Sequence, residues 1–86
     1  MTITQNPTVV RPSGGQPLLC HPTYLTFKRL NPTALALWSL LARPATTTDL
    51  VEWSARTYEL PRAVAERDIQ EFVADLFRDG FLRECE

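Results

Sequence analysis

The sequence has little of what most catalytic or metal sites need: one histidine and two cysteines in 86 residues. Cys20, His21 and Cys85 do not show metal-ligand spacing, so we expect neither a metal nor a cofactor. On a strand, neighbouring residues point to opposite faces, so Cys20 and His21 are not placed to act as nucleophile and base. We therefore predict no catalytic residues.

Long apolar runs and an excess of basic charge are also missing. No stretch of about 18 apolar residues could form a transmembrane helix, so no membrane contact is expected. The polar N-terminus lacks the basic and apolar regions of a signal peptide, so the chain is expected to be cytoplasmic. Its net charge of −1 lacks the basic balance that gives DNA-binding modules much of their affinity, so no nucleic-acid partner is expected.

What the chain does contain is enough apolar residue for one small domain. Hydrophobic residues make up 44% of the sequence, which is normal for a globular protein. A domain of this size buries only about 60% of its unfolded surface, which leaves little room for a deep active site beside a core. We expect residues 1–7 to form a flexible tail and residues 8–86 to form a single domain that is not an enzyme.

Short β-prone runs separated by turn residues predict three strands in the first third of the chain. They cover residues 8–11, 18–21 and 24–29. Gly14-Gly15 and Pro22-Thr23 supply the turns between them. The short connections predict an antiparallel meander, which needs to pack on helices to be stable.

The junction after the third predicted strand is sharply specified. Asn31 is a natural N-cap, and Pro32 suits the first position of a helix, so a helix is expected over residues 32–42. This leaves the strand at 24–29 short and at a candidate sheet edge. An open edge is a place where an extended peptide can bind as an added strand.

Two more helices are predicted downstream. The second begins near residue 47, after a hydroxyl and acid pattern typical of a capping box, and ends before residue 60. The third runs from residue 61 or 62 to residue 79, with apolar residues at three- and four-residue spacing, and Gly80 stops it. Strands followed by helices predict an α+β fold of winged helix-turn-helix type, with a three-stranded antiparallel sheet followed by three helices.

A set of short motifs resembles the PqqD-like family over nearly the whole chain, from about Val9 to Leu82. The motifs are Gly14-Gly15, Leu18-Leu19, Phe27, Leu30-Asn31-Pro32-Thr33, Trp38, Glu66-Arg67-Asp68-Ile69, Phe72, Leu76 and Gly80-Phe81-Leu82. Within this family, the chain is most similar to the free-standing recognition proteins of lasso-peptide gene clusters.

This resemblance implies a recognition element for ribosomally synthesised and post-translationally modified peptides (RiPPs). Such a domain performs no chemistry. It binds the leader, the recognition segment of a precursor peptide, as a strand added to the third strand of its sheet. In lasso-peptide biosynthesis it presents the precursor to a leader peptidase, a transglutaminase-like cysteine protease, and to an asparagine-synthetase-like cyclase. The leader, the peptidase and the cyclase are therefore the expected partners.

The residues expected to bind the leader lie on the third strand and the third helix. They are Leu25, Thr26, Phe27, Lys28, Arg29, Leu30, Val64, Arg67, Asp68, Glu71, Phe72 and Asp75. Val64 and Phe72 would make apolar contacts, and the helix carboxylates would meet polar or basic leader groups. The basic residues would pair with acidic leader groups.

Two other functions remain as alternatives. A winged-helix DNA-binding regulator would bring Arg56, Arg62, Arg67 and Gln70 to base edges, although acidic neighbours on the same helices would repel phosphates. An adaptor would bind another folded protein through its helices. Salt-dependent binding to duplex DNA would identify the first alternative. Genes for a precursor, a peptidase and a cyclase nearby would favour the leader-binding function over the second.

Overall fold

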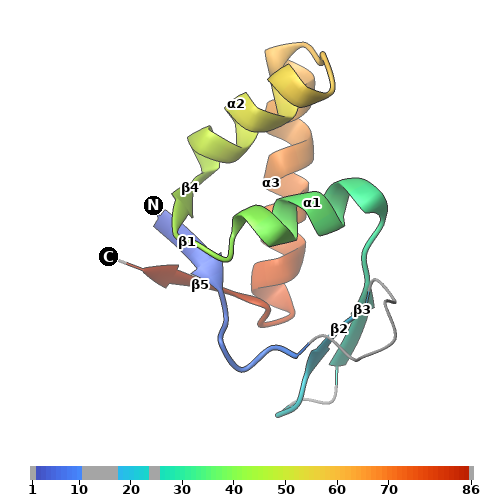
Figure 1. Ribbon diagram of the computed structural model, residues 1–86, viewed down its shortest axis with the longest axis vertical. Coiled ribbons are helices and arrows are strands. Elements are labelled where there is room, and N and C mark those ends of the chain that lie inside the picture. Colours follow the sequence, from blue (N-terminus) through green and yellow to red (C-terminus); the bar gives the residue numbers. More distant parts are fainter. Residues whose placement is uncertain (1, 11–17, 24–25, 86) are drawn as a thin grey trace.

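The computed structural model describes residues 2–10, 18–23 and 26–85. In chain order these residues form β1 (Thr2–Gln5), β2 (Leu18–His21), β3 (Thr26–Arg29), α1 (Pro32–Leu40), β4 (Ala45–Thr46), α2 (Thr47–Thr57), α3 (Arg62–Arg78) and β5 (Leu82–Cys85), as Figure 1 shows. The fold is α+β, with antiparallel strands and three helices, as the sequence predicts. Its likeness to a winged helix is only loose, because the strands are divided between two small sheets.

β1 is the central strand of a three-stranded antiparallel sheet, in the order β4-β1-β5. It pairs along its whole length with β5, which lies at the other end of the chain. Ile3 is completely buried, and the hydroxyl of Thr4 donates a hydrogen bond to the carbonyl of Leu41 at 2.8 Å. The expectation of a flexible tail over residues 1–7 is therefore wrong for β1. Its partner strands are distant in sequence, so no local pattern reveals them.

β2 and β3 form a separate two-stranded antiparallel sheet. β2 has the predicted bounds, and β3 begins at Thr26, because residues 24–25 of the predicted third strand lie outside the described residues. Of the strand expected over residues 8–11, Val10 makes a single bridge to Cys20, and residue 11 also lies outside the described residues. The predicted three-stranded meander is thus a two-stranded sheet with one bridging residue.

The starts of α1 and α2 follow local capping signals. The side-chain oxygen of Asn31 accepts a hydrogen bond from the backbone N–H of Ala34 at 2.7 Å. Thr46 and Asp49 form the expected capping box, in which each side chain accepts from the other's backbone N–H, at 3.1 and 3.0 Å. Such caps satisfy helix N–H groups that have no partner within the helix. They fix where the chain turns from β3 into α1 and from β4 into α2.

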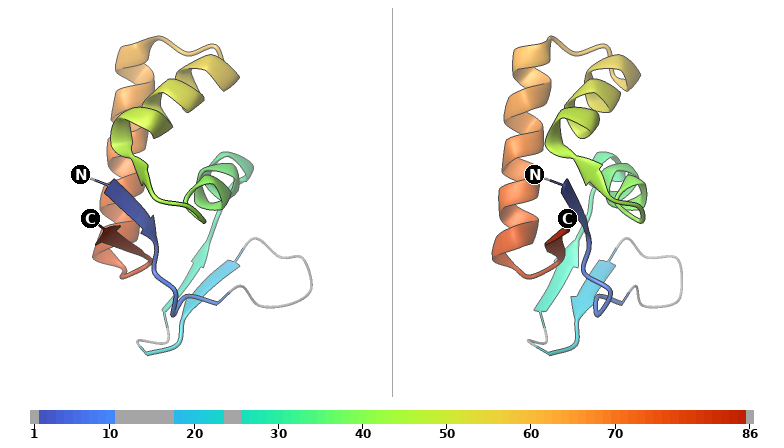
Figure 2. Two further views of the ribbon diagram at one scale, coloured as in Figure 1. Left: turned by 60° about the vertical axis from the view of Figure 1, so that its left-hand side comes forward. Right: turned by 90° about the vertical axis from the view of Figure 1, so that its left-hand side faces the viewer.

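α3 runs along the length of the molecule, and α2 packs beside its N-terminal half (Figures 1 and 2). The buried residues of α3 follow the predicted helical spacing: Ala65, Ile69, Val73 and Leu76. The helix ends at Arg78, and Gly80 follows in the left-handed region with φ of 81°, a conformation that glycine adopts without steric cost. Phe81 is then completely buried where the chain enters β5.

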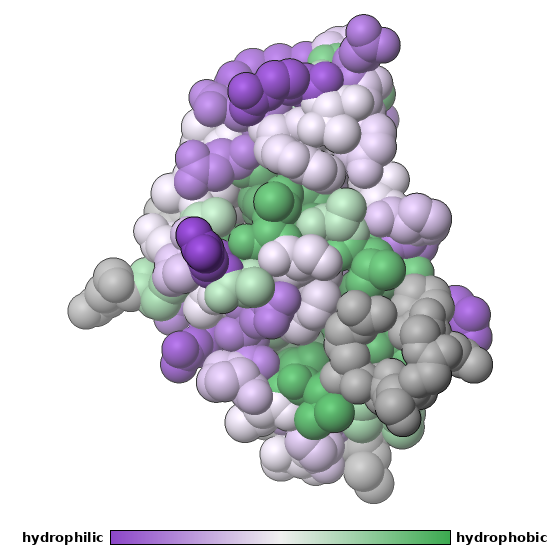
Figure 3. Space-filling model, in the orientation of Figure 1, coloured by the Kyte–Doolittle hydropathy of each residue, from purple (hydrophilic) through white to green (hydrophobic). Residues whose placement is uncertain are grey.

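The exposed apolar surface is scattered. In Figure 3 the hydrophobic residues of one face form separate patches among hydrophilic ones. The large apolar side chains that stay exposed among the described residues are Val10, Phe27, Leu40 and Tyr58. Within the same residues, no helix combines the length and the hydropathy needed to cross a membrane.

Candidate functional site

β3 has one free edge among the described residues. It pairs with β2 from Thr26 opposite His21 to Arg29 opposite Leu18, and no described strand pairs with its other edge. An unpaired edge presents a row of backbone N–H and C=O groups that another strand can complete. β3 can therefore accept an added strand.

A cavity of about 580 Å³ lies beside this edge, between β3 and the three helices. It is lined by Lys28, Arg29, Leu30, Asn31, Thr33, Ala34, Leu37, Ser54, Tyr58, Leu60, Asp68, Ile69, Glu71, Phe72, Asp75 and Leu76. We call this cavity the groove. Its volume falls within the range of roughly 300–1,000 Å³ that is typical of ligand sites.

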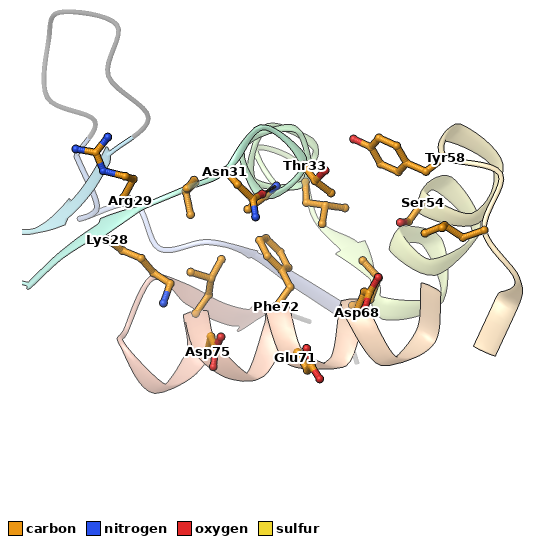
Figure 4. Close-up of a pocket in the computed structure, with 16 residues that line it drawn as sticks. Lys28, Arg29, Asn31, Thr33, Ser54, Tyr58, Asp68, Glu71, Phe72 and Asp75 are labelled. Atoms are coloured by element: carbon orange, nitrogen blue, oxygen red, sulfur yellow. Dashed lines mark hydrogen bonds between the residues drawn. The ribbon is translucent and has the colours of Figure 1, made fainter. Parts of the chain in front are cut away.

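The floor of the groove is apolar. Leu30, Leu37, Ile69 and Leu76 are almost completely buried and belong to the hydrophobic core. Phe72 is partly buried, and Figure 4 shows its ring pointing from α3 into the middle of the groove. The core thus supplies an apolar surface against which a bound side chain can be removed from water.

Lys28 joins β3 to the C-terminal end of α3. Its ammonium group forms an ion pair with Asp79 at 3.2 Å, and both side chains are 27% exposed. The expected role of Lys28 was to meet an acidic leader group, whereas in this structure its partner is an acid of the chain itself. The pair holds the strand against the helix at one end of the groove, and the side chain of Arg29 stays exposed beside it.

Carboxylates line the α3 wall of the groove. Asp75 pairs with Arg78 at 3.2 Å, and Asp68 makes a longer contact of 3.8 Å with Arg67. Glu71 makes no ion pair with any described residue. Exposed ion pairs of this kind contribute little to stability, so a ligand can replace the arginine partner of Asp68 or Asp75 at little cost in free energy.

The structure brings most of the predicted site residues together, although no observation tests their role in binding. Those that line the groove are Lys28, Arg29, Leu30, Asp68, Glu71, Phe72 and Asp75. Thr26, Phe27, Val64 and Arg67 do not line it, and Leu25 lies outside the described residues. Phe27 is 64% exposed and stands opposite Cys20 on the other face of the strand pair, whose inner face carries buried Leu19.

The contribution of α1 and α2 to the groove is not predicted from the sequence. Asn31 and Thr33 belong to the junction that the sequence marks clearly, and their place beside β3 follows from the cap. Ser54 and Tyr58 carry no local signal, because they reach the groove only through the packing of α2 on α3.

Other candidate sites carry less chemistry. A cavity of about 290 Å³ between α2 and α3 is lined by Thr47, Thr48, Val51, Arg62, Glu66, Ile69 and Gln70.

Within the described residues, no group of three or more histidine, cysteine or acidic side chains could hold a metal ion. His21 is buried, and its ring makes an edge contact with Phe81 at 6.3 Å between centroids. Cys20 and Cys85 are free thiols.

A known protein family matches the groove-forming part of the chain. The family described as coenzyme PQQ synthesis protein D (PqqD) matches residues 19–82, from β2 to the start of β5. No curated protein and no solved structure matches the chain significantly. The matched segment is well over half of the chain and includes both β3 and α3. The chain therefore belongs to the PqqD family, as is consistent with a PqqD-like RiPP recognition element.

Proposed function

We propose that this protein binds the leader of a RiPP precursor as an added strand on β3, with leader side chains held in the groove. The PqqD family suggests a role in binding RiPP precursors in general. The observation that carries the proposal is the position of the free β3 edge directly beside an apolar groove. Strand addition combines these two features, because main-chain bonds give affinity and pockets give selectivity.

The size of β3 shows that backbone pairing is not sufficient on its own. A four-residue strand offers only a few hydrogen bonds, each with a net value of about 0.5–1.5 kcal/mol. Ordering a flexible segment costs about 2–5 kcal/mol. Burying ~150 Å² of an apolar leader residue would add roughly 4 kcal/mol at ~25 cal/mol per Å². An apolar leader residue beside Phe72 is therefore the main anchor in this proposal.

The pathway is the finer part of the proposal. We assign the protein to lasso-peptide biosynthesis in the cytoplasm, where it performs no chemistry and presents the precursor to the leader peptidase and then to the cyclase. The resemblance of the Leu30-Asn31-Pro32-Thr33 motif and the Trp38 helix to lasso-type relatives supports this assignment. A copurification of the protein with the peptidase and with the cyclase, each tested with and without precursor, would show which of them it contacts.

The proposal is tested by titrating the protein with a fluorescent leader peptide taken from the precursor gene beside its own gene. Anisotropy should show saturable binding to the wild-type protein. Phe72→Ala should weaken binding by about tenfold, because it removes an apolar contact of roughly 1.5 kcal/mol. Phe77→Ala is the matched control, since Phe77 is a partly buried residue of the same helix that does not line the groove. Equal weakening by both variants, or no binding at all, would refute groove binding.

A further inference from the structure

The groove continues beyond the end of β3, and its chemistry changes there. Figure 4 shows Lys28 and Arg29 on one side of Phe72, with Asp68, Ser54 and Tyr58 on the other side. The far end is built by α2 and its C-cap together with the N-terminal half of α3. We call this end, lined by Thr33, Ser54, Tyr58, Asp68 and Glu71, the distal subsite.

Ser54 is the feature of the distal subsite that points to a ligand. The residue is 3% exposed, yet its hydroxyl forms no hydrogen bond with any described residue. It lines the groove, and in Figure 4 its oxygen points toward the cavity. This oxygen is not fully shielded from solvent, and a hydrogen-bonding group of a ligand can reach it from the groove.

The charge of the distal subsite is negative. Asp68 points toward it from α3, and Glu71 lines the groove one turn further along the helix. The only ion pair that either makes with described residues is the 3.8 Å contact of Asp68 with Arg67. The two basic residues that line the groove, Lys28 and Arg29, lie at the opposite end. That end also carries the carboxylate of Asp75, and Lys28 is paired there with Asp79. Among the described residues that line the distal end none is basic, so this end would repel an acidic side chain.

We infer that the distal subsite receives an arginine or lysine side chain of the bound peptide. This inference rests on the proposed function and adds the class of residue that the groove selects. A cationic group can donate to the carboxylates of Asp68 and Glu71 and to the hydroxyl of Ser54, and the ring of Tyr58 can contact a cation through its face. An apolar side chain would leave these groups without partners.

The direction of β3 fixes where this residue lies in the peptide. β3 runs toward Leu30 and α1, so the distal subsite lies beyond its C-terminal end. A peptide that pairs antiparallel to β3, the commoner arrangement, has its N-terminal side at that end. The basic residue is therefore expected N-terminal to the apolar anchor and to the residues that pair with the strand.

The test uses a display library of random peptides of about 12 residues, long enough for a strand and the segment beyond it. Peptides selected on the wild-type protein should share an apolar residue, with arginine or lysine enriched at positions N-terminal to it. The same selection on the Asp68→Asn/Glu71→Gln double variant should keep the apolar residue and lose the basic one. Glu52→Gln is the control, because Glu52 is exposed on α2 and does not line the groove.

Affinities of one selected peptide complete the test. The double variant should bind it about tenfold more weakly, and Ser54→Ala about three- to tenfold more weakly. Replacing the basic residue by norleucine should remove most of both effects. Selected peptides with an apolar anchor and no basic preference would overturn this inference and leave strand addition intact. No peptides selected on the wild type, or peptides insensitive to Phe72→Ala, would overturn both proposals.

Discussion

Replacing Ile3 by alanine tests whether the N-terminal residues belong to the fold. The side chain is 0% exposed and lies in the core cluster, on a strand that pairs with β4 and β5. Substituting a buried isoleucine by alanine costs about 2–5 kcal/mol, since apolar contacts are lost and a cavity remains. A domain of this length is stable by roughly 4–13 kcal/mol, so the variant should lose a large part of its stability.

Thermal unfolding followed by circular dichroism measures this loss. A destabilisation of about 3 kcal/mol should lower the Tm by roughly 12–24 °C in a domain of this size. Val10→Ala is the control, because Val10 is also β-branched and near the N-terminus but is 52% exposed. It should change stability by less than about 0.5 kcal/mol. If Ile3→Ala moved the Tm no more than Val10→Ala does, β1 would not be part of the stable structure.

Three further predictions concern the cap of α1, the Lys28–Asp79 ion pair and the charges of α2 and α3. Asn31→Ala removes the N-cap of α1 and should lower the free energy of unfolding by about 1 kcal/mol. Without peptide, the Tm should fall by about 4–8 °C. An unchanged Tm would show that the 2.7 Å capping hydrogen bond does not contribute to stability. A double-mutant cycle of Lys28→Met with Asp79→Asn should give a coupling energy below about 1 kcal/mol, because both side chains are 27% exposed. The coupling energy should fall with added salt, and a coupling energy independent of salt would contradict this prediction. The protein should show no saturable binding to fluorescent duplex DNA at low or physiological salt, because acidic residues surround the basic residues of α2 and α3. Salt-dependent binding would favour the winged-helix DNA-binding regulator instead.

Local signals account for the parts of the fold that the sequence predicted well. The N-cap at Asn31 and the capping box at Thr46 each depend on residues within one helical turn, so their effect can be read without knowing the tertiary structure. The buried face of α3 follows from helical spacing for the same reason. The end of α1 was less predictable: the helix stops at Leu40, short of residue 42, because Leu41 leaves helical geometry and its carbonyl accepts from β1.

Features that depend on distant contacts were missed. β1 and β4 are short and become strands only because β1 lies between β4 and β5. The same holds for the site. β3, Phe72 and the α3 carboxylates were predicted from the resemblance and from helical spacing, whereas Ser54 and Tyr58 line the groove because of how α2 crosses α3. Phe27 is predicted to bind the leader as part of the third strand; its side chain is exposed and does not line the groove, and its role in binding stays a prediction.

The most direct test of strand addition is hydrogen exchange of the β3 backbone amides, followed by NMR with and without the leader peptide. In an antiparallel sheet, successive residues direct their N–H groups to opposite edges. Leader binding should therefore slow exchange at alternate residues of Thr26–Arg29, those whose N–H groups face the free edge, and leave the amides of β1 and β5 unchanged. Exchange that stays the same throughout β3 while the leader is bound would contradict strand addition.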